Sequence, residues 1–388
     1  MPRTRLHSAE PQPVSFVELF FDLVFVFAVT QMTVLAADDL TIGGSLRAIL
    51  LFWLIWWAWT QFTWTLSPAD TGNTIVRVCT LLAAGAAFVM AASVPRAFQD
   101  DPFGFALPYL LIRLAGMGLQ VRIDHESTDT ESAVSRTWIS LSLVGLVLVF
   151  VGAWQGTPAR NWLWMAAIGL DLAAAAASSR DAVWDLSASH FSERHALFVI
   201  IALGESLVVA ATAVAQDERS GALMFAAGAS LLVASLLWWT YFGWLKEAME
   251  HRFAEVAPEE LGPTARDAFS LLHFPLVCGV IAFAVAVEEI VAHPEHPVRA
   301  DVVTSLSAGI GLFVGASALA YWRVSKVLLV PRLAALAGTL VVVALVRNQD
   351  PVWPLVAVAA GLMVIVVAEG SPERRRPASH EGTGSIQG

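Results

Sequence analysis

Long apolar runs dominate the chain and alternate with short polar breaks. The runs are about 18–25 residues long and rich in Leu, Ala, Val and Phe. A membrane β-barrel would instead show alternating segments of about 10 residues. Because every backbone N–H and C=O group must be paired within a segment that crosses hydrocarbon, such runs form helices. The pattern therefore predicts an all-α polytopic membrane protein whose main partner is the lipid bilayer.

The polar breaks divide the chain into about twelve spans. They carry turn residues such as Ser67-Pro68, which end one helix and allow the next to begin. The predicted spans are residues 14–37, 42–66, 74–93, 103–121, 137–154, 158–178, 195–215, 221–245, 268–292, 302–322, 328–346 and 353–369.

A short aromatic motif recurs near the ends of the second and eighth spans. Residues 59–64 read Trp-Thr-Gln-Phe-Thr-Trp and residues 239–244 read Trp-Thr-Tyr-Phe-Gly-Trp, so four of six positions are identical at an offset of 180. Interfacial aromatic belts also enrich Trp, but the shared Thr and Phe favour duplication. We therefore expect a 6+6 parallel pseudo-repeat, with halves at 14–178 and 195–370 and a cytoplasmic linker at 179–194.

Charge and composition add an orientation. With a cytoplasmic N-terminus, six of the 23 Lys and Arg residues fall at outer connections and the other 17 fall on, or toward, the cytoplasmic side. Residues 1–13 and 371–388 are then cytoplasmic tails, the second of them disordered. A charged fraction of 14%, a net charge of −10 and scattered basic residues give no nucleic-acid footprint.

Two acidic residues lie near the start of the first span. Ser15 and Glu18 fit a capping box, so Glu18 either closes the helix N-terminus or takes part in a buried network. Asp22 lies one turn deeper on the same face, where no cap explains it. Arg77, near the start of the third span, is expected to reach toward the membrane surface and to serve Glu18.

Arg113 occupies the fourth span at a similar depth to Asp22. Its guanidinium cannot lose its proton and needs a carboxylate or carbonyl groups. Asp22 and Asp171 are the carboxylates in the same layer, and we expect at least one of them to pair with Arg113. Such a network is equally compatible with a structural role and with transport.

The seventh span carries the densest set of polar candidates. Glu205, near the midplane, is a candidate proton- or cation-binding residue, although a protonated Glu could also serve as an interhelical hydrogen bond. Gly204 beside it predicts a closely approaching helix. Glu193 and Arg194, at the cytoplasmic entrance, read as a helix cap and a surface ion pair. His190 and His195 fit interfacial histidines better than a proton relay.

Other signals for chemistry are weak. His273 precedes Phe274-Pro275, so we expect a kinked helix in which His273 or a water satisfies a freed carbonyl. The following loop, with His293 and His296, reads as solvated rather than as a metal site. Two lone cysteines give no disulfide or zinc framework. With no nucleophile, phosphate-binding or zinc-protease motif, we expect no enzyme activity, no metal site and no cofactor.

Two runs of residues resemble a known family. Residues 18–27 read Glu-Leu-Phe-Phe-Asp-Leu-Val-Phe-Val-Phe, and residues 190–206 begin His-Phe-Ser-Glu-Arg and end Leu-Gly-Glu-Ser. Together they resemble the bacterial low temperature requirement protein A (LtrA) family, from about residue 14 to residue 370. The resemblance implies a polytopic protein of the bacterial inner membrane, named for a cold-growth phenotype, and implies no defined substrate.

Three hypotheses of function follow from these features. The first is an ion- or proton-coupled transporter of a small solute, based on the duplication and the intramembrane charges. The second is a non-transporting stress sensor or scaffold whose intramembrane charges are structural. The third, an intramembrane lipid-modifying enzyme, lacks a nucleophile or a metal signature. The sequence leaves the substrate, the coupling ion and homo-oligomer formation open.

Overall fold

The protein is built from helices of membrane-spanning length. The computed structural model describes residues 6–8, 12–126, 136–181, 186–216, 220–350 and 352–370. The predicted tail 371–388 and residues 182–185 of the predicted linker lie outside this described part. Its longer helices are α1 (Phe16–Asp38), α2 (Ile42–Leu66), α3 (Thr74–Ala92), α4 (Pro102–Glu126), α5 (Arg136–Trp154), α6 (Ala159–Asp181), α7 (Ala188–Gln216), α8 (Gly221–Phe242), α11 (His273–Ala292), α12 (Ala300–Ser325), α13 (Val330–Val346) and α14 (Val352–Glu369).

These helices coincide with the predicted spans. In the described part of the chain, ten helical stretches are long and apolar enough to cross a membrane, and α13 is a shorter apolar helix. The remaining predicted span is α6, whose 23 residues match the required length but are less apolar. The prediction of an all-α polytopic membrane protein is confirmed.

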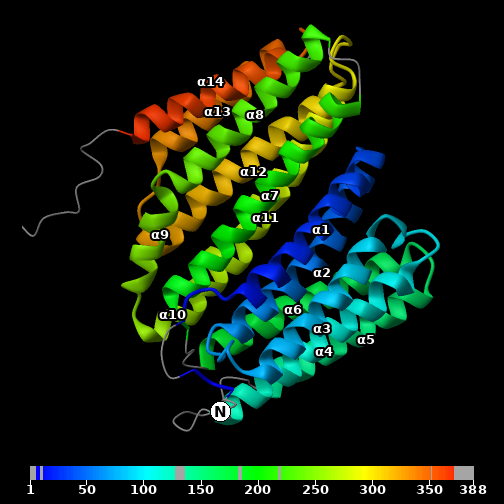
Figure 1. The fold of residues 1–388 in the computed structure, drawn as a ribbon, viewed down its shortest axis with the longest axis vertical. Coiled ribbons are helices and arrows are strands. Elements are labelled where there is room, and N and C mark those ends of the chain that lie inside the picture. The colour runs from blue at the N-terminus through cyan, green and yellow to red at the C-terminus, as the bar shows by residue number, and fades with distance from the viewer. Residues whose placement is uncertain are drawn as a thin grey trace, which may run out of the picture.

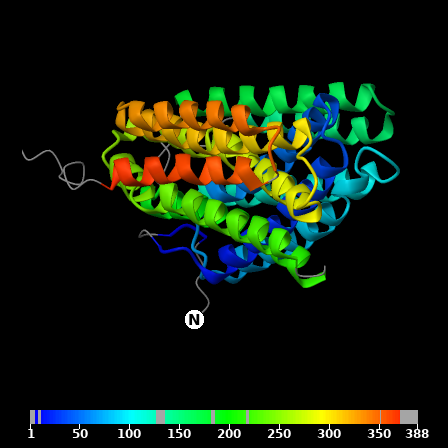
Figure 2. The same ribbon diagram turned by 90° about the horizontal axis from the view of Figure 1, so that it is seen from above.

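The helices form two groups that lie side by side. Figure 1 shows α1 to α6 on one side and α8, α12, α13 and α14 on the other. Seen from above in Figure 2, α14 lies alongside α13 and α8, against which it packs. Between the two groups α1 packs against α7 and α11, and α7 packs against α11. We call α1, α7 and α11 the seam.

Both described ends of the chain lie at one end of the bundle. Glu18 at the start of α1 contacts Arg194 at the start of α7, and Trp244 after α8 contacts Glu369 at the end of α14. A ring contact between Phe191 and Phe253 joins these two regions. We call this end the terminus face and the opposite end the far face.

Two predicted spans differ from the observed helices at their ends. The span predicted at 268–292 is preceded by α10 (Pro258–Thr264) and by a π-helical segment, η2 (Ala265–Leu271), and α11 begins only at His273. Two tryptophans of α2 hold this segment: Trp56 Nε1 donates to the Ser270 carbonyl at 2.7 Å, and Trp64 Nε1 donates to Ser270 Oγ at 2.9 Å. The helix after α8, α9 (Leu245–Ala254), lies beyond the predicted eighth span.

Glycine allows the backbones of α11 and α12 to approach each other closely. A Cβ atom built on Gly279 would lie 2.6 Å from the Gly309 carbonyl oxygen, and one built on Gly309 would lie 2.8 Å from the Phe283 nitrogen. Backbones that approach this closely leave room only for glycine. The close approach predicted at Gly204 is wrong, because a Cβ there would meet no atom within 4 Å.

Gly309→Val is expected to lower the free energy of unfolding by about 1–3 kcal/mol, because the added side chain overpacks the α11–α12 contact. Gly311→Val is the matched control, since a Cβ at Gly311 in the same helix meets nothing within 4 Å. Thermal unfolding of both variants in detergent measures the difference. Equal stability of the two variants would contradict the packing argument.

Candidate functional site

A buried cluster of charges joins α1 to α7 near the terminus face. Glu18 and Asp22 are four residues apart on α1, so their side chains share one face. Arg194, in the second turn of α7, donates from Nη1 to Glu18 Oε1 at 3.4 Å and from Nη2 to Asp22 Oδ1. All three side chains are fully buried. Helix packing across the seam thus places a guanidinium between two carboxylates.

Two neighbours complete this cluster. Trp59 Nε1 of α2 donates to Asp22 Oδ1 at 2.7 Å. His190 Nε2 lies 3.0 Å from Glu18 Oε1. We call Glu18, Asp22, Trp59, His190 and Arg194 the seam network.

The seam network has more carboxylates than permanent cations. Two carboxylates face one guanidinium, which leaves a formal charge of −1 unless His190 or one carboxyl group carries a proton. Burying an uncompensated charge costs several kcal/mol. The network therefore needs one additional positive charge, and a proton or a small cation can supply it.

Glu18 fulfils both roles that the sequence leaves open. Its Oε2 accepts from the Ser15 backbone N–H at 2.9 Å and from Ser15 Oγ at 2.8 Å, which ties Glu18 to the start of α1. Its Oε1 faces Arg194 and His190. The hydrogen bonds from Ser15 hold Oε2 of Glu18, and Oε1 remains available to contact Arg194 and His190.

A second buried ion pair lies within the first group of helices. Arg113 of α4 donates from Nη2 to Asp171 Oδ1 at 2.9 Å and from Nη1 to Asp171 Oδ2 at 3.1 Å, and Asp171 lies on α6. Tyr109 Oη accepts from Arg113 Nη1 at 2.9 Å. The expected pairing of Arg113 with a carboxylate of its layer is present, and the partner is Asp171. This bidentate pair is charge-balanced.

A third buried pair was not predicted. Arg332 of α13 donates from Nε and Nη2 to the two oxygens of Glu369 on α14, both at 2.8 Å, and from Nη2 to the Thr240 carbonyl. Arg332 Nη1 also donates to Ser317 Oγ, and Trp244 Nε1 donates to Glu369 Oε2. In the sequence both charges stand at span ends, where long side chains usually reach water, so no signal pointed to their burial.

Two predicted contacts at the terminus face are wrong. Arg77 does not serve Glu18, because its side chain is exposed and its Nε donates to the Thr71 carbonyl at 2.9 Å. Arg194 is not in a surface ion pair, because α7 begins at Ala188 and carries Arg194 into the seam. Glu193, the adjacent residue, remains half-buried.

His195 and His273 lie in an aromatic core across the seam, with their rings 5.4 Å apart. His195 Nδ1 donates to the Phe191 carbonyl at 2.9 Å. His273 Nδ1 donates to the Ala268 carbonyl at 2.9 Å, and its Nε2 lies 2.7 Å from Tyr241 Oη. A carbonyl only accepts, so both rings carry hydrogen on Nδ1, and the Tyr241 hydroxyl donates to His273. His273 thus satisfies a carbonyl of the π-helical segment, that of Ala268, whereas the missing N–H of Pro275 frees the carbonyl of Leu271.

Glu205 stands apart from these pairs. The middle residue of α7 is Ala202, so Glu205 lies one turn from the middle toward the far face. Its side chain is 9% exposed, and no hydrogen bond or ion pair to it is found in the part of the chain that the structure describes. Glu205 is therefore a buried acid without a cationic partner among these residues.

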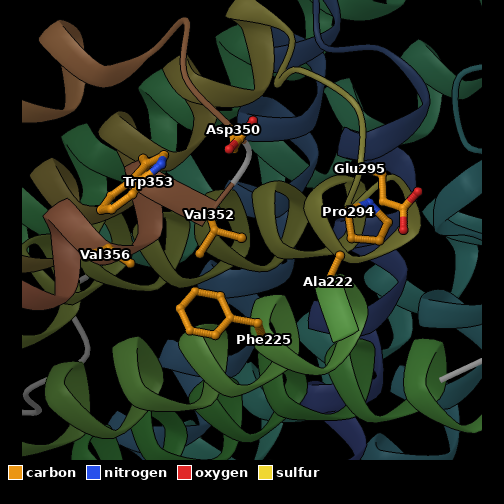
Figure 3. Close-up of a pocket in the computed structure, with 8 residues that line it drawn as sticks. All are labelled: Ala222, Phe225, Pro294, Glu295, Asp350, Val352, Trp353 and Val356. Atoms are coloured by element: carbon orange, nitrogen blue, oxygen red, sulfur yellow. The ribbon is translucent and has the colours of Figure 1, made fainter. Parts of the chain in front are cut away.

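Two pockets at the far face, formed by described residues, contain none of the predicted site residues. Figure 3 shows the residues that line a pocket at the far face, between the start of α8 and the start of α14. The pocket has a volume of about 410 Å³. Its lining residues are Ala222, Phe225, Pro294, Glu295, Asp350, Val352, Trp353 and Val356. Among the described residues no group of His, Cys, Asp or Glu is arranged to hold a metal ion.

Comparison with known proteins identifies the family. Residues 13–367 match the model of the bacterial low temperature requirement A protein (LtrA). The chain belongs to the LtrA family. A protein of Rhizobium meliloti (strain 1021), itself uncharacterised, is 30% identical over 310 residues, which cover 75% of this chain and 72% of that protein. No solved structure matches the chain.

The part of the chain that matches the family includes every predicted site residue. The LtrA match extends over every helix from α1 to α13 and most of α14, and it includes the seam network, the Arg113–Asp171 pair and Glu205. The resemblance drawn from the two sequence runs is thereby confirmed. One run supplies Glu18 and Asp22 and the other supplies His190, Arg194 and Glu205, so both family runs meet at the seam.

Proposed function

We propose that this LtrA family member is a proton- or cation-coupled transporter of a small solute. The observation that supports this most is the seam network, in which two buried carboxylates share one guanidinium. A site of this kind binds one positive charge where the two helix groups meet. The charge-balanced Arg113–Asp171 pair lacks this property.

Binding at the network is coupled to helix packing. A proton on Asp22 removes one of the two carboxylate charges that hold Arg194, and the contact between α1 and α7 is weakened. Two arrangements of the seam then differ in their affinity for the proton, which is the requirement for coupling ion binding to a conformational change. Transporters commonly place such sites where two repeats meet.

The helix contacts support a two-half organisation of the transporter. In the first group α1 packs against α2 and α3, α3 against α4, and α5 against α6. In the second group α7 packs against α8 and α11, α11 against α12, and α13 against α14. The same order of contacts, together with the repeated aromatic motif of α2 and α8, favours the 6+6 pseudo-repeat. Arginine placement favours an inner-membrane orientation with both termini cytoplasmic.

Asp22→Asn is expected to abolish proton-driven uptake and to leave the amount of folded protein close to the original. The substitution leaves Glu18 and Arg194 as a balanced pair that attracts no further charge. Liposomes containing the purified protein are given a small-molecule extract of bacteria and an imposed pH gradient, acidic on the outside. Mass spectrometry of the retained solutes is expected to show at least a tenfold loss of accumulation relative to the unaltered protein.

Glu193→Gln is the matched control on α7, since Glu193 is half-buried and outside the network. This variant is expected to accumulate the same solutes as the unaltered protein, and a protonophore is expected to stop uptake by both. Uptake by Asp22→Asn at the original level would overturn the coupling role of the network. No accumulation by the unaltered protein would favour a structural role for all the buried charges.

A further inference from the structure

The seam network needs one more positive charge than Arg194 supplies, and the groups around Asp22 do not favour a proton on that residue. Asp22 Oδ1 accepts from Trp59 Nε1 at 2.7 Å and from Arg194 Nη2, and Oδ2 accepts from Arg194 Nε at 3.4 Å. An indole N–H and a guanidinium only donate, so a protonated Asp22 would direct its O–H at donors and break one of these hydrogen bonds. This arrangement therefore favours the ionised form of Asp22.

Glu18 is likewise surrounded by donors. Its Oε2 accepts from the backbone N–H and the hydroxyl group of Ser15, and its Oε1 faces Arg194 Nη1 and His190 Nε2. A carboxylate that accepts several hydrogen bonds is favoured in its ionised form. The hydrogen between Glu18 and His190 therefore lies on the imidazole ring, at Nε2.

His190 has an open position for a further proton. Its side chain is 3% exposed, its Nε2 lies 3.0 Å from Glu18 Oε1, and its Nδ1 is buried with no hydrogen-bond partner in the part of the chain that the structure describes. Nδ1 lacks a partner whether or not it carries a hydrogen, so a proton added there breaks no hydrogen bond. The ring then becomes an imidazolium that still donates from Nε2 to Glu18.

The charges that face His190 favour this imidazolium. Helix α1 presents Glu18 and Asp22 to this turn of α7, and Arg194 lies one turn further along α7 itself. Helix α2 and the η2 segment present aromatic rings to the same turn, which contact Phe191. Two carboxylates and one guanidinium sum to −1, and a protonated His190 brings the sum to zero.

We infer that His190 is the proton-binding residue of the seam network and takes the proton at Nδ1. The proton balances the network and holds α1 against α7, and its loss leaves one buried carboxylate uncompensated. In the proposed transporter, on which this part of the inference rests, the coupling ion is then the proton. It enters from the terminus face, because His190 lies in the first turn of α7. Asp22 takes a proton only after Arg194 has moved away.

Nitrogen NMR of the histidine rings tests the inference without any solute. In full-length protein reconstituted in lipid with isotope-labelled histidine, the ring nitrogen shifts distinguish an imidazolium from each neutral tautomer. The His190 signal is assigned by its loss in His190→Gln. Where that variant does not fold, through-space transfer to the labelled carboxyl carbon of Glu18 assigns it. At the pH where half of the exposed His293 is protonated, we expect His190 to be mainly an imidazolium.

Asp22→Asn changes the charge of the network without touching His190. The remaining Glu18 and Arg194 balance each other, so the ratio of imidazolium to neutral His190 is expected to fall about tenfold at the same pH. Glu18→Gln also leaves a single carboxylate and is expected to act in the same direction. Glu193→Gln is the matched control, because it removes a half-buried carboxylate of α7 outside the network, and it is expected to leave the ratio unchanged.

The outcomes separate this inference from the transport proposal. A neutral His190 in the unaltered protein at that pH, or the same ratio in Asp22→Asn, would overturn the inference. A ratio that falls when sodium or potassium ions are added at constant pH would also overturn it, since a metal cation would then balance the network. Proton-driven uptake by a protein with neutral His190 would reject the inference and retain transport. Protonated His190 in a protein that accumulates no solute would do the reverse.

Discussion

Arg194→Ala is expected to lower the free energy of unfolding by about 3–5 kcal/mol, which exceeds the effect of most single substitutions. The alanine leaves Glu18 and Asp22 facing each other, fully buried, without the guanidinium between them. The contact of Arg194 with the ring of Trp59 is lost as well. Thermal unfolding in detergent, followed by size-exclusion chromatography, is expected to show little monodisperse protein.

Restoring charge balance is expected to rescue this variant. Adding Glu18→Gln and Asp22→Asn to Arg194→Ala removes both carboxylates, so most of the lost stability should return. Arg77→Ala is the control, because Arg77 is exposed and a surface substitution changes stability by about 0.5 kcal/mol or less. If Arg194→Ala were as stable as Arg77→Ala, the buried network would not hold α1 to α7.

Hydropathy predicted the helices well because membrane insertion itself depends on it. A run of apolar residues long enough to cross the bilayer has few other stable structures, so all twelve predicted spans correspond to helices. The start of α7 was misplaced for a physical reason. Residues His190 to His195 are mostly polar and look like a surface segment, but all except Glu193 are buried, and their contacts include Glu18 and Asp22 of α1 and Trp59 of α2. Whether such a polar segment is exposed or buried is determined by the packing of neighbouring helices against it.

The partners of the buried charges could be predicted only in part. The estimated depth of Arg113 in the membrane restricts its candidate partners to the carboxylates of the same layer, and one of these, Asp171, is its partner. Depth could not show that α1 and α7 are neighbours, so Arg194 was assigned to the surface. The sequence does not predict the π-helical segment, because Pro275 indicates a kink in the helix without its geometry. The burial of Arg194 and the π-helical segment both depend on contacts between segments that are distant in the sequence.

Arg113→Leu alone is expected to cost about 3–5 kcal/mol, whereas Arg113→Leu combined with Asp171→Leu is expected to be close to neutral or stabilising. The single substitution leaves a buried carboxylate on α6 without its partner. The double substitution removes both charges and replaces them with apolar side chains that suit the surrounding helices. The two unfolding measurements, with Asp171→Leu as the third, complete a double-mutant cycle.

Uptake by the double variant then separates the two kinds of buried charge. The Arg113–Asp171 pair is balanced and makes no demand for a further proton, so the leucine pair is expected to retain proton-driven uptake. The seam network has one carboxylate more than its arginine can balance, so Asp22→Asn is expected to lose proton-driven uptake. A stable double variant without uptake would place Arg113 and Asp171 in the transport cycle and would refute the distinction by charge balance.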